Sequence, residues 1–98
     1  MAAYFIAHFN VKDPVLFAEY QKESAPTLAG YSVKFIAIDG AAEVLEGKAP
    51  GPISVVIEFE SKEKMKEWYE SAAYQAVLPK RLAATEGFTV IAQGMGQG

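Results

Sequence analysis

The sequence predicts an α+β domain with the ferredoxin-like βαββαβ order, in which a four-stranded antiparallel sheet carries two helices on one face. Stretches rich in branched and aromatic residues alternate with two amphipathic stretches in that order. Residues that favour helix starts precede both amphipathic stretches. A chain of 98 residues fits one domain, which we place at residues 1–93, with a flexible tail at 94–98.

The first strand is expected over residues 4–11, where nearly every position is apolar and only two polar side chains interrupt the run. Asp13 and Pro14 follow as an N-cap and a first-turn proline, so a helix begins there. Pro26 is expected to end that helix, because proline disfavours helical conformation at the residue before it.

The middle of the chain predicts two further strands. Residues 32–39 form the second strand, which Gly40 breaks. Residues 41–47 either continue that strand after a bulge or form a short edge segment. Residues 48–52 are a loop, and residues 53–60 form the third strand, with apolar residues at alternate positions.

Ser61 is the N-cap of the second predicted helix. Its inward stripe follows helical spacing and consists of Met65, Trp68, Tyr69 and Ala72. Ser71 is expected to cap a second helical segment over 72–84, set at an angle to the first.

Pro79 predicts a kink or an early end within that segment, because proline costs about 3 kcal/mol in a helix interior. Residues 87–93 form the fourth strand.

Both faces of the first and third strands are apolar, yet the helices of this fold cover only one face. A second copy of the sheet, related by a two-fold axis, is the economical cover for the other. We therefore expect a homodimer that closes a barrel-like assembly. A lone domain of this size also has a thin core, which favours self-association.

Composition argues against several functional classes. The net charge is −3 with no basic run, so no nucleic-acid partner is expected. The chain has no Cys and one His, so we expect no disulfide, zinc finger or other metal site. No glycine-rich phosphate loop appears, and no cofactor is expected. Without a signal peptide or an apolar run of about 18 residues, we expect a cytoplasmic protein with no membrane partner.

Several short motifs resemble the domain of unknown function 1330 family, whose members are small dimeric α/β-barrel proteins. The resemblance covers residues 4–93. Its motifs are Asp13-Pro14 with Tyr20, Tyr31, Val44-Leu45-Glu46-Gly47, Ile57-Glu58-Phe59, Ser61, Trp68-Tyr69, Ser71, Tyr74-Gln75 and Arg81. The sequence departs from the family pattern at Ser32-Val33, where two glycines are usual, at Ala72, where proline is usual, and at Pro79.

The resemblance implies the fold and the dimer. The wider superfamily includes cofactor-free monooxygenases of aromatic polyketides, haem-degrading monooxygenases, lactone isomerases and stress-responsive proteins. Its small hydrophobic ligands commonly lie between the sheet and the helices, so the resemblance implies such a cavity here.

His8 and Glu58 are the candidate catalytic residues. Imidazole titrates near neutral pH and can serve as a general base or acid. The alternative is a strand histidine whose hydrogen bonds are satisfied by its neighbours at the dimer face. A carboxylate facing an apolar lumen has a raised pKa, although Glu58 also has Lys34 within reach as an ion-pair partner. The two residues fall toward opposite ends of neighbouring strands, roughly 10 Å apart, so no dyad within one chain is expected.

Asn10, Trp68 and Tyr69 are candidate ligand-binding residues. Asn10 together with Trp68 is similar to an Asn and Trp pair of haem-degrading relatives, but this chain has no counterpart of their iron-binding helix His. Haem degradation by that route is therefore not expected. The alternative for Trp68 and Tyr69 is a role in the core, because they have the spacing of core residues. The alternative for Asn10 is a role in a turn, because it lies at the end of a strand.

Tyr20, Tyr74 and Arg81 complete the candidate ligand-binding set. Each tyrosine brings a hydroxyl that needs a partner when it is buried. Arg81 can hold a carboxylate ligand bidentately, or it can pair with Glu70, Glu86 or the partner chain.

Two functions stay open at this stage. One is a cofactor-free oxygenase or isomerase of a small aromatic or lactone-like compound, with His8 or Glu58 as the base. The other is a non-catalytic dimer that binds a small molecule or acts in a stress response. Catalysis requires a polar group near the substrate inside the cavity, whereas binding requires only the cavity.

Overall fold

The computed structural model describes residues 1–95 of the chain. The elements follow the predicted order, with a short 3-10 helix (η1) after the first α-helix. They are β1 (Ala3–Val11), α1 (Pro14–Ser24), η1 (Ala25–Leu28), β2 (Val33–Asp39), β3 (Ile53–Phe59), α2 (Lys62–Glu70), α3 (Ala72–Ala84) and β4 (Thr85–Gln93). The expected tail lies partly outside the described residues, and Gly94 still donates a backbone hydrogen bond to the Ala2 carbonyl at 2.8 Å.

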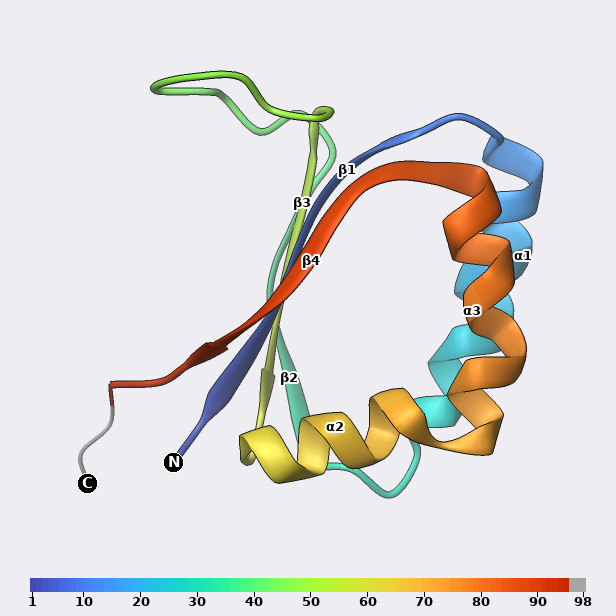
Figure 1. The fold of residues 1–98 in the computed structure, drawn as a ribbon, viewed down its shortest axis with the longest axis vertical. Coiled ribbons are helices and arrows are strands. Elements are labelled where there is room, and N and C mark those ends of the chain that lie inside the picture. The colour runs from blue at the N-terminus through green and yellow to red at the C-terminus, as the bar shows by residue number, and fades with distance from the viewer. Residues whose placement is uncertain (96–98) are drawn as a thin grey trace.

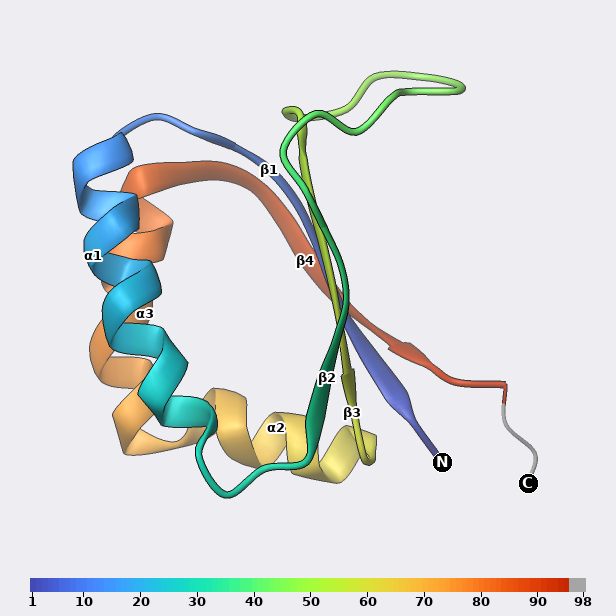
Figure 2. The ribbon, with the colours of Figure 1, turned by 180° about the vertical axis from the view of Figure 1, so that it is seen from behind.

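The sheet has the strand order β2-β3-β1-β4, and all neighbouring strands are antiparallel. The protein therefore has the predicted α+β ferredoxin-like fold. The described α-helices all lie on one face of the sheet, with α1 and α3 side by side and α2 at one end of the strands (Figures 1 and 2). The predicted division at Ser71 is confirmed, because Ser71 has extended backbone angles and separates α2 from α3.

The predicted caps begin all three α-helices. Each cap side chain accepts a hydrogen bond from the backbone N–H three residues on, which satisfies one of the free donors of the first turn. The bonds are Leu16 to Asp13 Oδ1 (3.0 Å), Lys64 to Ser61 Oγ (3.1 Å) and Tyr74 to Ser71 Oγ (3.2 Å). Helix α1 ends at Ser24, close to the predicted stop, and Pro26 lies in the first turn of η1.

The expected early end of the last helix at Pro79 is wrong, since α3 continues to Ala84. Pro79 is exposed, so water can reach the Gln75 carbonyl that loses its helical partner. The buried residues of α3 lie both before and after the proline and hold the two halves on the same core. These residues are Tyr74, Val77, Leu78, Arg81 and Ala84.

The segment 41–47 forms no strand, contrary to the expectation of a continued or edge strand. It belongs to a long connection between β2 and β3 that projects beyond the sheet (Figure 1). The Ala42 N–H donates to the Pro52 carbonyl at 2.9 Å and closes the base of this connection. Leu45 is 95% exposed, so the segment has no packing that would hold it against a strand.

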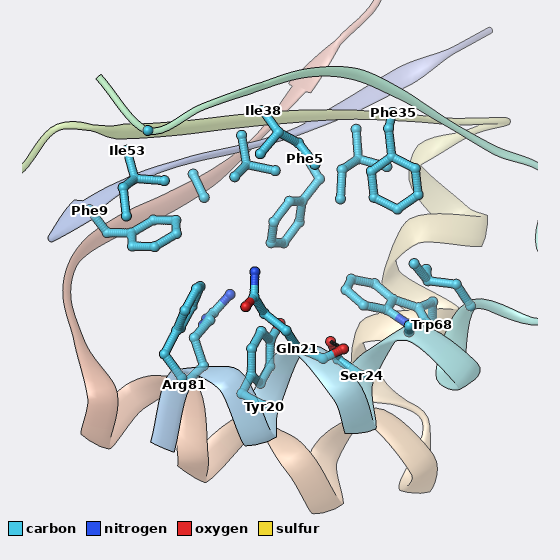
Figure 3. A pocket seen from close by; sticks show the side chains of 17 residues that line it. Phe5, Phe9, Tyr20, Gln21, Ser24, Phe35, Ile38, Ile53, Trp68 and Arg81 are labelled. Atoms are coloured by element: carbon cyan, nitrogen blue, oxygen red, sulfur yellow. Dashed lines mark hydrogen bonds between the residues drawn. The ribbon is translucent and has the colours of Figure 1, made fainter. Parts of the chain in front are cut away.

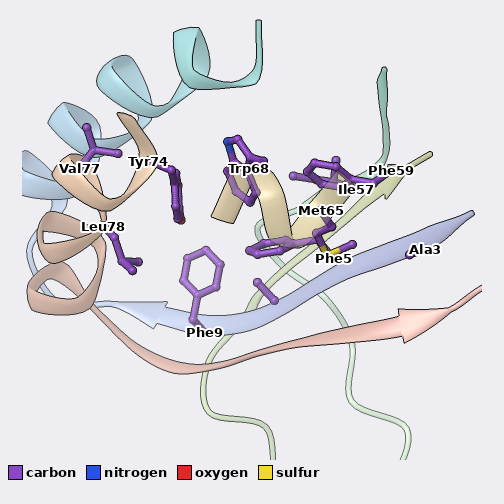
Figure 4. Packing of buried hydrophobic residues seen from close by; sticks show 11 residues of the cluster. Ala3, Phe5, Phe9, Ile57, Phe59, Met65, Trp68, Tyr74, Val77 and Leu78 are labelled. Carbon is purple, nitrogen blue, oxygen red and sulfur yellow. The ribbon is translucent and has the colours of Figure 1, made fainter. Parts of the chain in front are cut away.

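The residues of the central strand β1 alternate between the two faces of the sheet. Ala3, Phe5, Ala7 and Phe9 are buried against the helices, where they join a core with residues of β3, α2 and α3 (Figure 4). The even-numbered residues of β1 lie on the opposite face, which none of the described helices covers. The pairing register places the following apolar residues on that open face: Ile6, Val56, Phe88, Val90 and Ala92.

Candidate functional site

A cavity of about 380 Å³ lies between the sheet and the helices (Figure 3). Most of its wall is apolar or aromatic. The lining side chains and backbone belong to Phe5, Ala7, Phe9, Phe17, Tyr20, Gln21, Ser24, Ala25, Leu28, Phe35, Ile38, Gly40, Ile53, Val55, Ile57, Trp68 and Arg81. The cavity is therefore where the superfamily resemblance predicts a ligand site.

The sheet side of the cavity is entirely apolar. Phe5 and Phe9 come from the central strand, and Ile53 comes from the start of β3 (Figure 3). Phe35 and Ile38 come from the edge strand β2, where a shift of register between Phe35 and Ala37 turns both side chains toward the helices. A regular strand would place residues 35 and 38 on opposite faces, so this β-bulge helps to build the wall.

The helix side of the cavity carries its polar groups. Tyr20, Gln21 and Ser24 come from α1, and Arg81 comes from α3 (Figure 3). The Gln21 amide and the Arg81 guanidinium both point from the helices toward the sheet in this view. No carboxylate or imidazole belongs to the part of the wall that the structure describes.

Arg81 is a buried cation at this wall, with 8% of its surface exposed. Within residues 1–95 it makes no ion pair and no side-chain hydrogen bond, so the predicted pairing with Glu70 or Glu86 within the chain is wrong. Its backbone carbonyl accepts a bond from Thr85 Oγ1 at 2.8 Å, which fixes the end of α3. A second hollow on the β4 side also contacts Arg81.

Tyr20 and Tyr74 join α1 to α3 through a hydrogen bond of 2.7 Å between their hydroxyls. Tyr74 is fully buried in the core, and Tyr20 is half-buried and lines the cavity. Burial raises the pKa of Tyr74 far above its usual value, and the neighbouring Tyr20 raises it further, while the positive charge of Arg81 opposes the shift. The buried hydroxyls therefore have the partner that the sequence required.

Trp68 lines the cavity and also belongs to the core. Its ring lies 4.1 Å from that of Tyr74 and 5.7 Å from that of Phe5, measured between centroids. Its Nε1 donates to Thr27 Oγ1 at 2.9 Å, so the indole is held at both ends. Tyr69 does not line this cavity and contributes to two other hollows near β4.

His8 lies on the open face of the sheet, away from the cavity. Its Nε2 is 2.8 Å from the Gly51 carbonyl, and its Nδ1 is 2.8 Å from Ser54 Oγ. In the tautomer that fits, Nε2–H donates to the carbonyl and the serine hydroxyl donates to Nδ1. His8 thus joins β1 to the start of β3, with Phe88 stacked beside its ring.

Asn10 and Glu58 also lie on the open face. Glu58 pairs in register with Tyr4, and Tyr4 lies four residues before His8 on β1. Glu58 and His8 are therefore about 13 Å apart along the strands. The structure brings Tyr20, Trp68 and Arg81 to one cavity, but not His8, Asn10, Glu58, Tyr69 or Tyr74.

Among residues 1–95, no group of three or more acidic or His side chains is placed to hold a metal ion. None of the described helices is long and apolar enough to cross a membrane.

The sequence reasoning missed Phe5, Phe9 and Gln21 as cavity residues. Phe5 and Phe9 follow the period-2 alternation of a strand, which could have identified them once the helix-covered face was known. Gln21 carries no such signal, because it is polar and lies one residue past Tyr20, outside the helical spacing of Phe17 and Tyr20 on α1. Arg81 continues the spacing of the buried residues Tyr74, Val77 and Leu78, and this signal marks it as buried.

Comparison with solved structures shows the same fold at low sequence identity. A protein of unknown function from Rhodopseudomonas palustris has a TM-score of 0.80 and 13% identity, covering 98% of this chain and 84% of its own. A dimeric protein of unknown function with a ferredoxin-like fold from Bacteroides fragilis has a TM-score of 0.61 and 16% identity, with coverages of 95% and 96%. SnoaB, a cofactor-independent oxygenase from Streptomyces nogalater, has a TM-score of 0.63 and 12% identity, with coverages of 98% and 95%.

Sequence comparison places the chain in a family. None of the curated proteins matches it. The family model described as a domain of unknown function matches residues 2–95, nearly the whole chain, and agrees with the motifs found in the sequence. The chain belongs to the domain of unknown function 1330 (DUF1330) family.

Proposed function

We propose that this protein binds a small apolar or aromatic molecule in the cavity between its sheet and its helices. The cavity itself is the observation that carries the proposal, with about 380 Å³ of space and a mostly apolar wall. Ligand sites in proteins begin at about 300 Å³ and are mainly apolar, with a few polar groups that fix orientation. A cavity near this lower limit fits a compound of about two fused rings.

Ligand binding is favoured over base catalysis by the chemistry of the cavity wall. Neither His8 nor Glu58 faces the cavity, and no carboxylate or imidazole takes their place among the described wall residues. A general base must come within about 3 Å of the proton that it removes. A catalytic role for His8 or Glu58 therefore stays a prediction that requires a second site on the open face of the sheet.

The second candidate function is cofactor-free oxygenation, which the likeness to the cofactor-independent oxygenase SnoaB favours. A compound that ionises readily in water needs no protein base, and the cavity would supply a dry wall and one cation. Oxygen uptake measured with a hydroxylated polycyclic aromatic ketone tests this candidate. Uptake that the His8→Ala and Glu58→Gln variants retain in full would exclude both side chains as the base.

We also infer that two copies pair through the open faces of their sheets. Phe88 is 52% exposed and Val90 is 47% exposed on that face, and Ile6 and Val56 adjoin them. Such an apolar surface on a small protein is typical of an interface. The protein of similar fold from Bacteroides fragilis is described as dimeric, which supports self-association.

Native mass spectrometry of the freshly purified protein tests both proposals. A mass of two chains plus a small adduct would support the dimer and the ligand, whereas a bare monomer would contradict the dimer. Titration calorimetry with 2-naphthamide, a neutral aromatic probe, then tests the cavity directly. Ile38→Trp at the cavity wall should weaken binding, while Val15→Trp on an exposed part of α1 outside the wall should not. Equal binding by both variants would refute the cavity as the site.

A further inference from the structure

We infer that the ligand of this cavity is a planar oxyanion with two oxygens and a single negative charge, such as an aromatic carboxylate. Arg81 holds its charged end, and the aromatic sheet wall holds its body. The inference rests on the proposed function and adds the charge and the orientation of the bound molecule.

The burial of Arg81 is the first step. More than nine-tenths of its surface is covered, and within the described residues no carboxylate pairs with it. A guanidinium cannot lose its proton in a protein, so this charge cannot be neutralised by a pKa shift. A cation that loses most of its hydration without gaining a partner destabilises the fold. A ligand oxyanion would supply the missing partner.

The direction of the side chains is the second step. The guanidinium and the Gln21 amide both point from the helix side toward the sheet (Figure 3). No buried side-chain nitrogen or oxygen in the described chain lacks a partner, so the guanidinium nitrogens, which make no hydrogen bond, keep some accessible surface. This cavity is one of two hollows that Arg81 lines, and it is the one toward which the side chain points in Figure 3. The fork of a guanidinium matches two oxygens of a planar anion, and an amide donor beside it can bond a third lone pair.

The division of the wall is the third step, and it sets the orientation. Polar groups lie on the helix side, whereas Phe5, Phe9 and Ile53 form an apolar surface on the sheet side (Figure 3). An amphipathic molecule satisfies both sides only with its charged end at Arg81. Because Arg81 is the only charged residue of the described wall, a single negative charge balances it and a dianion would not.

Titration calorimetry with two matched probes tests the inference. 2-Naphthoate carries a carboxylate, and 2-naphthamide has nearly the same shape without the charge. The carboxylate of 2-naphthoate would form charged hydrogen bonds with Arg81, which are stronger than those of the neutral amide. We therefore expect the native protein to bind 2-naphthoate about tenfold more tightly than 2-naphthamide. Arg81→Met should remove this preference, and Arg81→Lys should keep part of it. Lys66→Met, which removes an exposed charge on α2, should leave the preference unchanged.

The outcomes separate this inference from the proposed function. If neither probe binds the native protein, the proposed function fails. If the two probes bind equally well, the cavity stands and the oxyanion inference is wrong. If Arg81→Met keeps the native preference for 2-naphthoate, the charge is recognised elsewhere and the role of Arg81 is wrong. The comparison of the two probes on the native protein needs no variant to fold.

Discussion

Replacing Arg81 with methionine should make the protein more stable while it removes the anion preference. The side chain is more than nine-tenths buried and has no ion-pair partner in residues 1–95, so the substitution breaks no salt bridge. The Thr85 hydroxyl donates to the backbone carbonyl of residue 81, which methionine retains. Methionine fills a similar length without a charge, and its flexible thioether adapts to the wall.

The size of the effect follows from the cost of a buried charge. Replacing buried ionic groups with apolar ones is neutral or stabilising by up to about 4 kcal/mol, and we expect about 1–2 kcal/mol here because the cavity still hydrates part of the guanidinium. For a domain of this size, 1 kcal/mol corresponds to about 4–8 °C in Tm, so the melting temperature should rise by about 5–15 °C.

Urea unfolding followed by far-ultraviolet circular dichroism, with a thermal melt alongside, measures the change. The Lys66→Met variant gives the baseline for losing one exposed positive charge, which should stay within about 0.5 kcal/mol. A loss of more than about 1 kcal/mol in Arg81→Met would refute the reasoning. Such a loss would mean that the guanidinium stabilises the fold without a ligand, so that no missing partner needs to be supplied.

Four further predictions concern the rest of the molecule. Val90→Asp on the open face should convert a dimer into monomers in light-scattering chromatography, whereas an unchanged dimer would place the interface elsewhere. Because the folded-state pKa of Tyr74 is raised above the unfolded value near 10, its contribution to stability is complete below pH 10 and is lost as the pH rises further; the urea midpoint should fall above pH 10, and less steeply in Tyr74→Phe. Gly51→Ala should destabilise the fold by about 1–3 kcal/mol in urea unfolding, because a Cβ there would collide with the backbone of Asn10, and a neutral result would show that the connection before β3 can move away from β1 at little cost. His8→Ala should cost about 1–2 kcal/mol through its two lost hydrogen bonds and leave 2-naphthamide binding unchanged, so a binding defect would contradict its place outside the cavity.

The fold was largely predictable because local signals agreed with the tertiary structure. Asp13, Ser61 and Ser71 each combine a capping side chain with a following apolar stripe, and each begins a helix. Of the two effects expected of Pro79, the early end does not occur, since that expectation used local preference alone. The packing of buried residues on both sides of the proline outweighs the loss of one helical hydrogen bond.

The site was less predictable, and the reason lies in the two faces of the sheet. His8 and Glu58 stood out as polar residues in apolar strands, but β1 is apolar on both faces, so the sequence does not say which face the helices cover. The bulge in β2 is also invisible in the sequence pattern, although it decides that Ile38 joins Phe35 at the cavity. Arg81 was identified by its residue type, and its missing partner became evident only from the structure.

Trp68 gives the protein an optical reporter at its own candidate site. It is the only tryptophan in the chain, and its indole forms part of the cavity wall. The rings of Tyr69 and Tyr74 lie 6.2 and 4.1 Å from it, close enough to pass absorbed light to the indole. All tryptophan emission therefore comes from one place, and an arriving aromatic molecule should quench it. Candidate compounds can thus be screened by fluorescence on the unlabelled native chain.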